Sequence, residues 1–542
     1  MTKLSTGDFD VAIIGYGPVG QCAAALLGRA GHRVVVLERH PNLYEGPRAT
    51  HIDQEVLRLL DAVGARESFD DYTPLYCVHV INGQGQPLAE APSPFDDSIA
   101  YGTDYQSWQP NLEAALDGAV ADCPSVELRR GFEVVDLRDL GGRVEIQAER
   151  QEIGDDGRRR GTGEIVRLTA TYAIAADGAN SRVREILGIE RHDFGFEGTW
   201  ANCDVASNVD FSQHPVTIGE GTFALGNHDL WMVMDPERDI AALPMGKSRR
   251  RFGWALLPDE DRAHFESEQL RWEVLGRWGL TANDVEVLSQ TFYAFEARLA
   301  KKFRQGNVFL AGDAAHTMPP HMGMGMRTGI RDARNLSWKL DLVLRGLAPD
   351  AFLNSYEDER LPHSRIWIET SKAIGDTTFV VDTDEAAARD EAYRSGRQAP
   401  PAGNQFPLET GLKPHDPDQA ALSGKMSPQG FVEREGVQAH LDALLPTLGF
   451  RIISVAGDPR EFLGAAALAF LHSVDTSFVT LTSDSVVGED EVIDVGGVYS
   501  DFMKENGIQV LVLRPDLYIF GAAARTDQVG TLVAALRKHI ES

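Results

Sequence analysis

The chain is poor in cysteine and has no long apolar run. Only four of its 542 residues are cysteines, and Cys22, Cys77, Cys123 and Cys203 form no CxxC pair. A disulfide framework or a cysteine zinc site is therefore poorly supported, no metal is expected, and we interpret the four as small buried hydrophobic residues. No segment reaches the roughly 20 apolar residues of a membrane span. The start, MTKLSTGDFD, lacks a signal-peptide core, so we expect a cytoplasmic protein.

Positive charge is also scarce. The chain has 52 Lys and Arg against 81 Asp and Glu, a net charge of −29 and a pI near 4.9. Such a surface repels phosphate backbones and anionic lipids, which argues against nucleic-acid and membrane partners. It leaves an anionic substrate open, because a pocket can carry local charge of the other sign. The length predicts two or three domains.

The first forty residues follow the order strand, glycine loop, helix, strand. An apolar run at 9–14 leads into GYGPVG, a helical stretch follows at 21–30, and RVVVL forms a second strand at 33–37. In such a loop Gly15 permits a tight turn, Gly17 lets a pyrophosphate approach the backbone, and Gly20 lets the helix pack on the strand. The helix N-terminus offers free N–H groups to phosphates. Glu38 then lies where a carboxylate accepts ribose hydroxyls, so the unit predicts dinucleotide binding.

A second glycine-bearing segment follows the apolar strand 307–311. Asp313, at the end of that strand, is placed to bind ribityl hydroxyls of a flavin. Gly323-Met324-Gly325-Met326 then enters a helix predicted over 325–345. Backbone N–H groups at such a helix start would stabilise negative charge on the N1–C2=O edge of a flavin.

The remaining sequence indicates two further regions. Short strand patterns from 192 to about 290 predict an antiparallel sheet that forms a second domain. Residues 400–417 are rich in Pro, Gly and polar residues and are typical of a linker. A fresh α/β pattern begins near residue 430, with strands expected at 450–455, 477–482, 508–514 and 517–520.

With ADGANSRVR at 176–184 and GDAAHTMPPHMGMGMRTGIRDARNLSWKL at 312–340, residues 8–400 resemble the single-component FAD-dependent aromatic hydroxylases. The 3-(3-hydroxyphenyl)propionate and phenol hydroxylases are the most similar types. The resemblance implies an α/β fold, with a Rossmann-type FAD-binding domain interleaved with an α+β substrate domain, and a thioredoxin-like C-terminal domain that here lacks cysteine. The expected divisions are FAD binding at 1–75, 103–190 and 284–400, a substrate-binding sheet at 76–102 and 191–283, a linker at 401–429, and the C-terminal domain at 430–542.

The resemblance also implies which residues hold FAD. The expected cofactor-binding set is Gly15, Gly17, Pro18, Gly20, Glu38, Arg39, Arg48, Gln109, Asp177, Gly178, Asp313, Pro320, Gly323, Met324, Gly325 and Met326. One departure is Met324, where many relatives carry Gln. A backbone contact would survive this change, whereas a side-chain contact would not.

The implied reaction uses NAD(P)H and O2. NAD(P)H reduces FAD, O2 adds at flavin C4a, and the resulting hydroperoxide transfers OH to an electron-rich aromatic ring while the protein excludes water. The chain has one dinucleotide fingerprint, which fits transient NAD(P)H binding. It has no redox cysteine pair, which argues against disulfide reductases, and no WxWxIP motif, which argues against flavin-dependent halogenases. A homodimer is common among such enzymes, and the sequence leaves the oligomeric state open.

Several residues are weaker candidates. His51 and Tyr293 are the predicted catalytic residues, as groups that could favour a phenolate-like substrate. Trp200 and His228 are candidates for the pocket wall, and His316 for ordering its loop. The run Arg249-Arg250-Arg251 is interpreted as a solvated or interface face, with contact to NAD(P)H phosphate as the alternative. Alternative functions are oxygenation of a polyketide or heteroaromatic and flavin binding without turnover.

Overall fold

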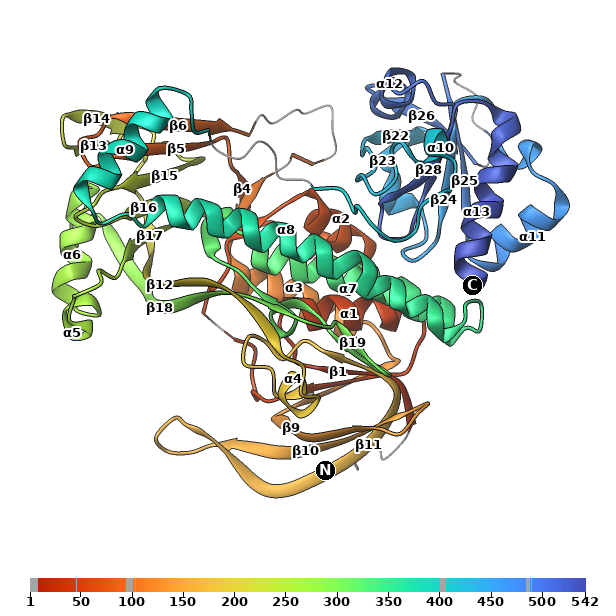
Figure 1. The fold of residues 1–542 in the computed structure, drawn as a ribbon, viewed down its shortest axis with the longest axis horizontal. Helices are drawn as coiled ribbons and strands as arrows, with labels where there is room; N and C mark the ends of the chain where they lie inside the picture. The colour runs from red at the N-terminus through yellow and green to blue at the C-terminus, as the bar shows by residue number, and fades with distance from the viewer. Residues whose placement is uncertain are drawn as a thin grey trace.

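The computed structural model describes residues 8–44, 46–93, 101–102, 104–399, 406–483, 488 and 490–542. Figure 1 shows an N-terminal α/β domain at the bottom centre, a large antiparallel sheet at the left and a C-terminal α/β domain at the right. Within the described residues, none of the helices combines the length and apolar character that a membrane span requires.

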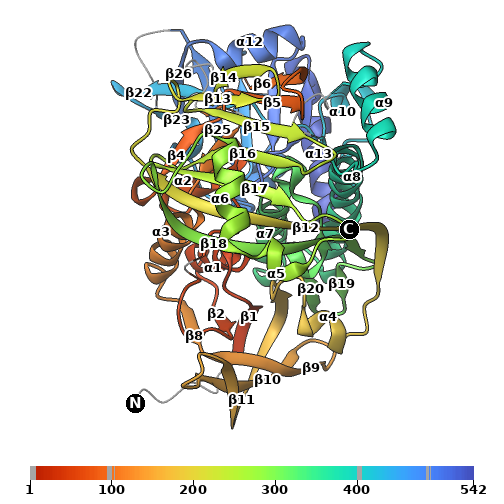
Figure 2. The same cartoon turned by 90° about the vertical axis from the view of Figure 1, so that its left-hand side faces the viewer.

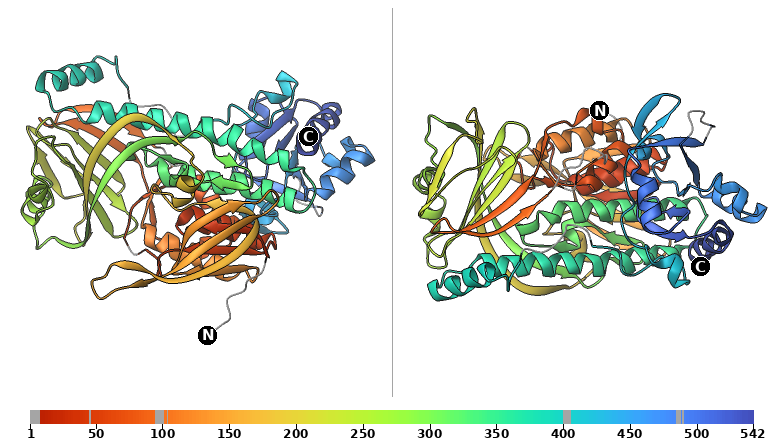
Figure 3. Two further views of the ribbon diagram at one scale, coloured as in Figure 1. Left: turned by 60° about the horizontal axis from the view of Figure 1, so that its bottom comes forward. Right: turned by 90° about the horizontal axis from the view of Figure 1, so that it is seen from above.

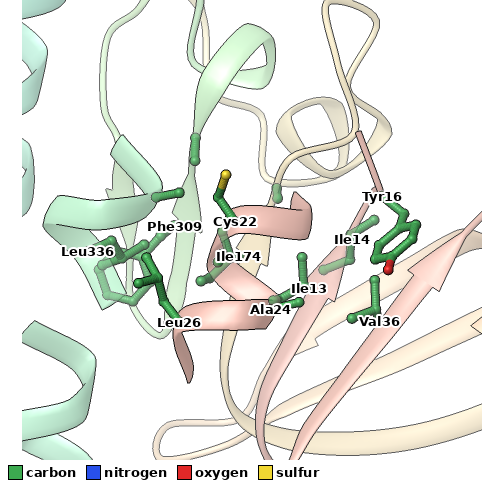
Figure 4. Close-up of a cluster of buried hydrophobic side chains, with 14 of the residues drawn as sticks. Ile13, Ile14, Tyr16, Cys22, Ala24, Leu26, Val36, Ile174, Phe309 and Leu336 are labelled. Carbon is green, nitrogen blue, oxygen red and sulfur yellow. The ribbon is translucent and has the colours of Figure 1, made fainter. Parts of the chain in front are cut away.

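The N-terminal domain is built on a mainly parallel sheet. Its order is β19-β20-β11-β1-β2-β8, and β1 pairs in parallel with both β2 and β11. Val11, Ala12 and Ile13 are fully buried because α1 packs on this strand and α7 packs on α1 in turn, and Figure 4 shows apolar side chains of these elements. The bounds are β1 (Asp8–Ile14), α1 (Pro18–Arg29), β2 (Val34–Glu38), β8 (Val126–Arg130), β11 (Arg159–Ala175), β19 (Arg304–Gln305) and β20 (Val308–Leu310).

An antiparallel extension of the main sheet, one small separate sheet and four helices complete this domain. The N-terminal half of β11 extends beyond the main sheet and pairs with β10, which pairs with β9. A three-stranded sheet of order β3-β7-β4 lies next to the candidate site described below. The bounds are β3 (His51–Ile52), α2 (Gln54–Ala62), β4 (Tyr72–Pro74), β7 (Tyr105–Ser107), α3 (Gln109–Ala121), β9 (Phe132–Asp139), β10 (Val144–Ile153), α4 (Arg182–Ile186) and α7 (Met324–Leu344).

The second domain is an eight-stranded sheet of order β21-β18-β12-β17-β16-β15-β5-β6. Figure 2 shows its outer face, crossed by α5 and α6. Its strands are β5 (Cys77–Asn82), β6 (Pro87–Pro92), β12 (Arg191–Ser207), β15 (Asp229–Met234), β16 (Ile240–Met245), β17 (Arg249–Ala255), β18 (Val285–Ala300) and β21 (His316–Thr317), with the hairpin β13 (Pro215–Ile218) and β14 (Gly221–Ala224) and the helices α5 (Arg262–Phe265) and α6 (Glu268–Arg277) beside them. The boundary expected at 284 falls just before β18, which pairs with β12 almost throughout, so the sheet extends to residue 300.

A long helix joins the sheet domain to the C-terminal domain. α8 (Asn354–Thr378) lies beside α7 and reaches from the C-terminal domain to the large sheet (Figure 3), and α9 (Thr383–Arg394) packs on β6. The sequence patterns did not predict α8 or α9. α8 carries Pro362 and has polar residues spread along it, so its periodicity is weak, and packing between the two domains decides its conformation.

The C-terminal domain is a seven-stranded sheet of order β23-β22-β26-β25-β24-β27-β28 with helices on its faces. β24, β25 and β26 are parallel, whereas β27 and β28 are antiparallel to their neighbours. Its thioredoxin-like character stays a prediction. The bounds are β22 (Phe431–Arg434), β23 (Val437–His440), β24 (Arg451–Ser454), α11 (Ala465–Ser473), β25 (Ser477–Thr482), β26 (Glu491–Val495), α12 (Val498–Glu505), β27 (Val510–Leu513), β28 (Ile519–Ala523) and α13 (Val529–Glu541).

The segment expected as a linker, 401–429, is largely packed where it is described. Its first five residues lie outside the described part. Beyond them, Leu408 and Leu412 are buried, α10 (Pro417–Ala420) packs on β28, and Leu408 N donates to Gly424 O at 2.8 Å. The Pro and Gly residues therefore shape an irregular but packed surface of the C-terminal domain.

Candidate active site

A single cavity of about 1510 Å³ lies between the N-terminal α/β domain and the inner face of the large sheet. All of the expected cofactor-binding residues line it except Gly20, and both predicted catalytic residues, His51 and Tyr293, line it too. Gly20 has a packing role instead, because a Cβ there would lie 2.1 Å from Gly15 O. The cavity therefore brings together segments that are some 300 residues apart in the sequence.

Two helix N-termini open into this cavity without a capping side chain. α1 begins after Gly17 and α7 begins after Gly323, and neither N-cap residue makes a side-chain hydrogen bond to its helix. The first N–H groups of a helix have no partner within it and carry partial positive charge. The start of α1 is thus available to a pyrophosphate. The start of α7, a helix of 21 residues, is available to a second electron-rich group.

The glycine loop has the geometry that a nucleotide needs. A Cβ on Gly15, whose φ is +101°, would lie 2.3 Å from Ala176 O, so only glycine fits this turn. A Cβ on Gly17 would meet nothing within 4 Å. The backbone at Gly17 is therefore open to the cavity, and a phosphate can approach it closely.

Two carboxylates at the cavity wall are already ordered by the protein. Glu38 accepts hydrogen bonds from Tyr16 N and His40 N, both at 2.7 Å, which fixes its side chain at the cavity wall. Asp177 accepts from Val183 N at 3.1 Å, whereas its Oδ1 is buried without a partner. Burial raises the pKa of Asp177. An unpartnered acceptor at a cavity wall fits a ligand that brings hydroxyl or N–H donors.

Asp313 and the start of α7 form another part of the cavity wall. Asp313 lines the cavity after β20, and desolvation raises the pKa of its carboxyl. Gly323 adopts the left-handed conformation at φ +60°, and Gly325 has only Met318 Cγ, at 4.0 Å, near its Cβ position. Met324 is fully buried, so the position that departs from the family pattern offers its backbone and not its side chain to a ligand.

Gln109 and Arg251 hold the turn at residues 47–49, which lies at the cavity wall. Gln109 Oε1 accepts from Arg48 N at 2.9 Å and from Ala49 N at 2.6 Å. Arg251 donates to Arg48 O and to Pro47 O, both at 2.9 Å. The side chain of Gln109 thus acts on the turn, whereas the guanidinium of Arg48 stacks over Tyr44 at 4.3 Å.

His51 lies between an ion network and the start of α7. Its Nε2 is 2.8 Å from Asp104 Oδ1, and a Cβ on Gly323 would lie 2.6 Å from its Nδ1. Asp104 also contacts Arg327 at 3.2 Å. Burial and the charge of Arg327 lower the pKa of His51. This geometry suits a residue that positions the glycine segment, and the catalytic role predicted for His51 stays a prediction.

The sheet contributes a mostly apolar wall. The apolar lining residues that its strands contribute are Val78, Val80, Ala89, Ala91, Pro92, Trp200, Leu230, Met232, Met234, Ala241, Leu243, Ala294 and Phe295. Tyr293 donates to Pro47 O at 3.3 Å, and burial raises its pKa, so its hydroxyl stays protonated. Asn202 faces the same space from β12. This wall can enclose an aromatic ring and exclude water.

His321 is a polar group that sequence reasoning did not single out. It follows Pro320, lines the cavity, and packs edge-on against Phe196 and Phe379. A Cβ on Gly375 would lie 2.7 Å from its Nε2 and 2.9 Å from its Cδ2. Nδ1 is the ring atom opposite that edge and therefore points away from α8. Burial lowers the pKa of His321 to about 4, so the ring is neutral near pH 7.

Three interpretations from the sequence need correction or completion. Arg250 and Arg251 are buried, so the basic run is no solvated face: Arg250 donates to Gly226 O and Asp229 O, and Arg251 pairs with Asp204 at 2.6 Å. His228 does not line the cavity and bonds to Thr73 at 2.7 Å instead. His316 is fully buried, with Nε2 2.7 Å from Asp332, which agrees with a loop-ordering role.

Comparison with known proteins identifies the class. Residues 8–371 match the family model described as FAD binding domain, and residues 424–539 match the HcaD C-terminal domain. A probable NADH-specific resorcinol 4-hydroxylase of Rhodococcus jostii is 33% identical over 97% of this chain and 94% of its own length. A 3-(3-hydroxy-phenyl)propionate/3-hydroxycinnamic acid hydroxylase of a Mycobacterium is 30% identical over 98% and 92%.

Solved structures show the same fold. The flavin-dependent monooxygenase PieE, in complex with FAD and substrate, aligns with a TM-score of 0.78 over 98% of this chain and 99% of that chain, at 21% identity. Aklavinone-11 hydroxylase, with FAD and aklavinone, gives a TM-score of 0.73 at 23% identity over 98% and 99%.

The chain belongs to the FAD-binding domain family. It is an FAD-dependent aromatic monooxygenase that uses a nicotinamide cofactor as reductant.

Proposed function

We propose that this enzyme hydroxylates a small uncharged phenol, of the kind that carries two ring hydroxyls, with NAD(P)H and O2. The observation that carries this proposal is the charge of the cavity wall on the sheet side. Among the described residues, Arg251 is the one cationic side chain that the large sheet contributes to the cavity. Its donors are committed to Asp204 and to the 47–49 turn.

A carboxylate on the substrate would therefore lack a cationic partner on the sheet side. The other lining arginines, Arg39, Arg48, Arg182 and Arg327, come from the N-terminal domain, and Arg327 is paired with Asp104. Burying an unpaired carboxylate against apolar side chains costs free energy that a neutral phenol does not incur. This favours a resorcinol-type substrate over the hydroxyphenylpropionate type that the sequence suggested.

His321 is the acceptor that this proposal assigns to a substrate hydroxyl. A neutral imidazole with Nδ1 facing away from α8 can accept a hydrogen bond from a phenolic O–H. Tyr293, already donating to Pro47 O, can accept a second one. Such hydrogen bonds orient the ring and increase electron density on it, and the apolar wall excludes water from the reacting face.

The same geometry supports a proposed position for the cofactor. The N-terminus of α1, Gly17 and Glu38 would hold the ADP half of FAD, and Asp177 and Asp313 would bind its polar linker. The start of α7 would face the pyrimidine edge of the flavin ring. When bound, FAD supplies the reduction of O2 and the transfer of one oxygen atom to the substrate.

The test compares matched neutral and charged substrates with the FAD-loaded enzyme. Resorcinol, 3-(3-hydroxyphenyl)propionate and the methyl ester of that acid are supplied with NADH or NADPH, and NAD(P)H oxidation is measured together with hydroxylated product. We expect kcat/KM for the ester to exceed that for the acid by about tenfold or more, with resorcinol turned over productively. A preference for the free acid would contradict the proposal. A homodimer stays a prediction, which sedimentation measurements would test.

A further inference from the structure

Buried charged side chains on and around α7 form four clusters. Three of the clusters carry no excess of positive charge. Each basic group in them has a carboxylate within 3.4 Å. The clusters are Arg360 with Asp332, Lys339 and Arg514 with Glu359 and Asp516, and Arg327 and Arg331 with Asp53, Glu55 and Asp104.

A fourth cluster is different because two arginines share one carboxylate and a third arginine, without an ion pair of its own among the described residues, lies near them. Arg58 on α2 donates to Asp442 Oδ2 at 2.5 Å, and Arg451 on β24 bonds to Asp442 Oδ1. Arg334 on α7 lies close enough for its charge to interact with these three groups. The exposed fractions are 1% for Arg58, 5% for Arg334 and 1% for Arg451. Three positive charges and one negative charge are therefore buried together.

Several guanidinium donors in this cluster have no acceptor. Nε and Nη2 of Arg334 and Nε and Nη2 of Arg451 are buried and make no hydrogen bond within the described residues. By contrast, Arg58 bonds to Ser427 O at 3.1 Å and Ser427 Oγ at 2.9 Å in addition to Asp442. Buried guanidinium donors almost always have partners in folded proteins.

Nearby carboxylates do not supply the missing charge. Glu55 and Asp516 act on the cluster electrostatically, but Glu55 is bonded to Arg331 at 2.8 Å and Asp516 to Arg514 at 2.6 Å. Burial lowers the pKa of Arg334 to about 10, which still leaves it protonated near pH 7. The excess positive charge thus persists in the folded protein.

We propose that Arg334 and Arg451, together with Arg58, bind a small inorganic anion at the junction of α2, α7 and the C-terminal domain. The near-complete burial of the three side chains restricts the ligand to the size of chloride or a similarly compact anion and leaves no room for a nucleotide. The site is distinct from the FAD cavity, because none of the three arginines lines it.

The position of this site couples it to domain packing. Arg58 and Arg334 belong to the N-terminal domain, whereas Arg451 and Asp442 belong to the C-terminal domain, so the anion binds fully only when the two are packed together. α7 starts in the flavin cavity and passes this site ten residues later. The bound anion therefore stabilises the packed arrangement, in which the C-terminal domain supports the flavin helix.

The direct test is a crystal of the FAD-loaded enzyme grown without halide and soaked in bromide. Anomalous scattering is expected to show bromide within hydrogen-bond distance of Arg334 and Arg451. Water alone among the three guanidiniums would overturn the proposal.

The solution test measures Tm of the holoenzyme in sodium gluconate, with chloride, bromide or phosphate replacing gluconate at constant ionic strength. Chloride and bromide are expected to raise Tm saturably, by about 3 °C at saturation. A larger effect of phosphate than of chloride would contradict the size limit and overturn the assignment to a compact anion. A linear, unsaturable effect, or a bromide peak in the crystal with no effect in solution, would mean binding at crystal concentration only and would contradict the proposal.

Arg334→Met is expected to abolish the saturable rise, because it removes two of the free donors. Arg525→Met is the matched control, since Arg525 is exposed and paired with Asp527 in the C-terminal domain. A retained response in Arg334→Met would overturn the assignment. If that variant fails to fold, the bromide experiment on the unmodified enzyme decides.

Discussion

Nε2 of His51 lies 2.8 Å from Oδ1 of Asp104, and the same carboxylate contacts Arg327 at the start of α7. In the sequence, His51 lies before β5 and β6, the first two strands of the second domain, and Asp104 lies after them. Their contact ties the small β3-β7-β4 sheet to the helix that begins in the flavin cavity. The pair therefore links the β3-β7-β4 sheet to the start of α7.

Asp104→Asn should weaken both folding and FAD binding. Burial alone would raise the pKa of Asp104, but contacts with His51 and Arg327 hold it well below its usual range, so the carboxylate is charged and its loss leaves Arg327 undercompensated. We expect the free energy of unfolding to fall by about 1–3 kcal/mol. Urea unfolding and FAD titration measure the two effects. The control Asp70→Asn removes an exposed pair with Lys247 and should change neither, and equal effects in both variants would refute the argument.

Gly17→Ala should weaken FAD binding, whereas Gly15→Ala should destabilise the folded apoprotein. A Cβ on Gly17 meets only open space, so the apoprotein should keep its stability while FAD affinity falls about tenfold or more, because the methyl group occupies the phosphate approach. Gly15→Ala should destabilise the apoprotein itself by about 2 kcal/mol or more, given the φ of +101° and the contact with Ala176 O.

Thermal unfolding without FAD, followed by flavin fluorescence titration, separates these two cases. Gly118→Ala in α3 is the control, because its Cβ also meets nothing within 4 Å, and it should leave FAD affinity unchanged. Unaltered FAD binding in Gly17→Ala would show that the pyrophosphate lies elsewhere.

His321→Phe should raise KM for a phenolic substrate by about tenfold while FAD stays bound. His321→Asn, which keeps an acceptor, should recover part of the loss, and the exposed His192→Phe should have no effect. Since the pKa of His321 is lowered to about 4, the acceptor stays neutral and KM should stay flat from pH 8 to about pH 5. Steady-state kinetics over that pH range measure these KM values. An unchanged KM in His321→Phe would show that His321 does not bind the substrate.

Asp239→Asn should stabilise the protein above neutral pH. Burial raises the pKa of Asp239 to about 8, whereas the unfolded value is near 4. The folded form therefore binds this proton more tightly, and stability is lost as pH rises from about 4 through 8. Urea unfolding at pH 5 and pH 8.5 should show a gain in the variant that is larger at pH 8.5. A gain in the free energy of unfolding that is the same at both pH values would contradict the raised pKa of Asp239.

Local sequence patterns were enough to predict the cofactor, which the comparisons support, and the elements that we propose hold it. The strand before Gly15, the uncapped helix after Gly17 and the glycines before α7 are local features, because tight turns and free helix N-termini need particular residues at fixed spacing. The same local patterns predicted β24, β25 and α7 closely. They did not predict α8, whose apolar residues follow no clear period.

The packing of distant elements, by contrast, sets which side chains line the cavity and which are bonded elsewhere. Arg251 reads as part of an exposed basic run, yet sheet pairing buries it beside Asp204 and the 47–49 turn. His321 was not singled out from the sequence, yet α8 and two phenylalanines enclose it. The arginine cluster around Asp442 joins residues from 58 to 451. Such contacts depend on how distant elements pack together, and local patterns in the sequence do not predict that packing.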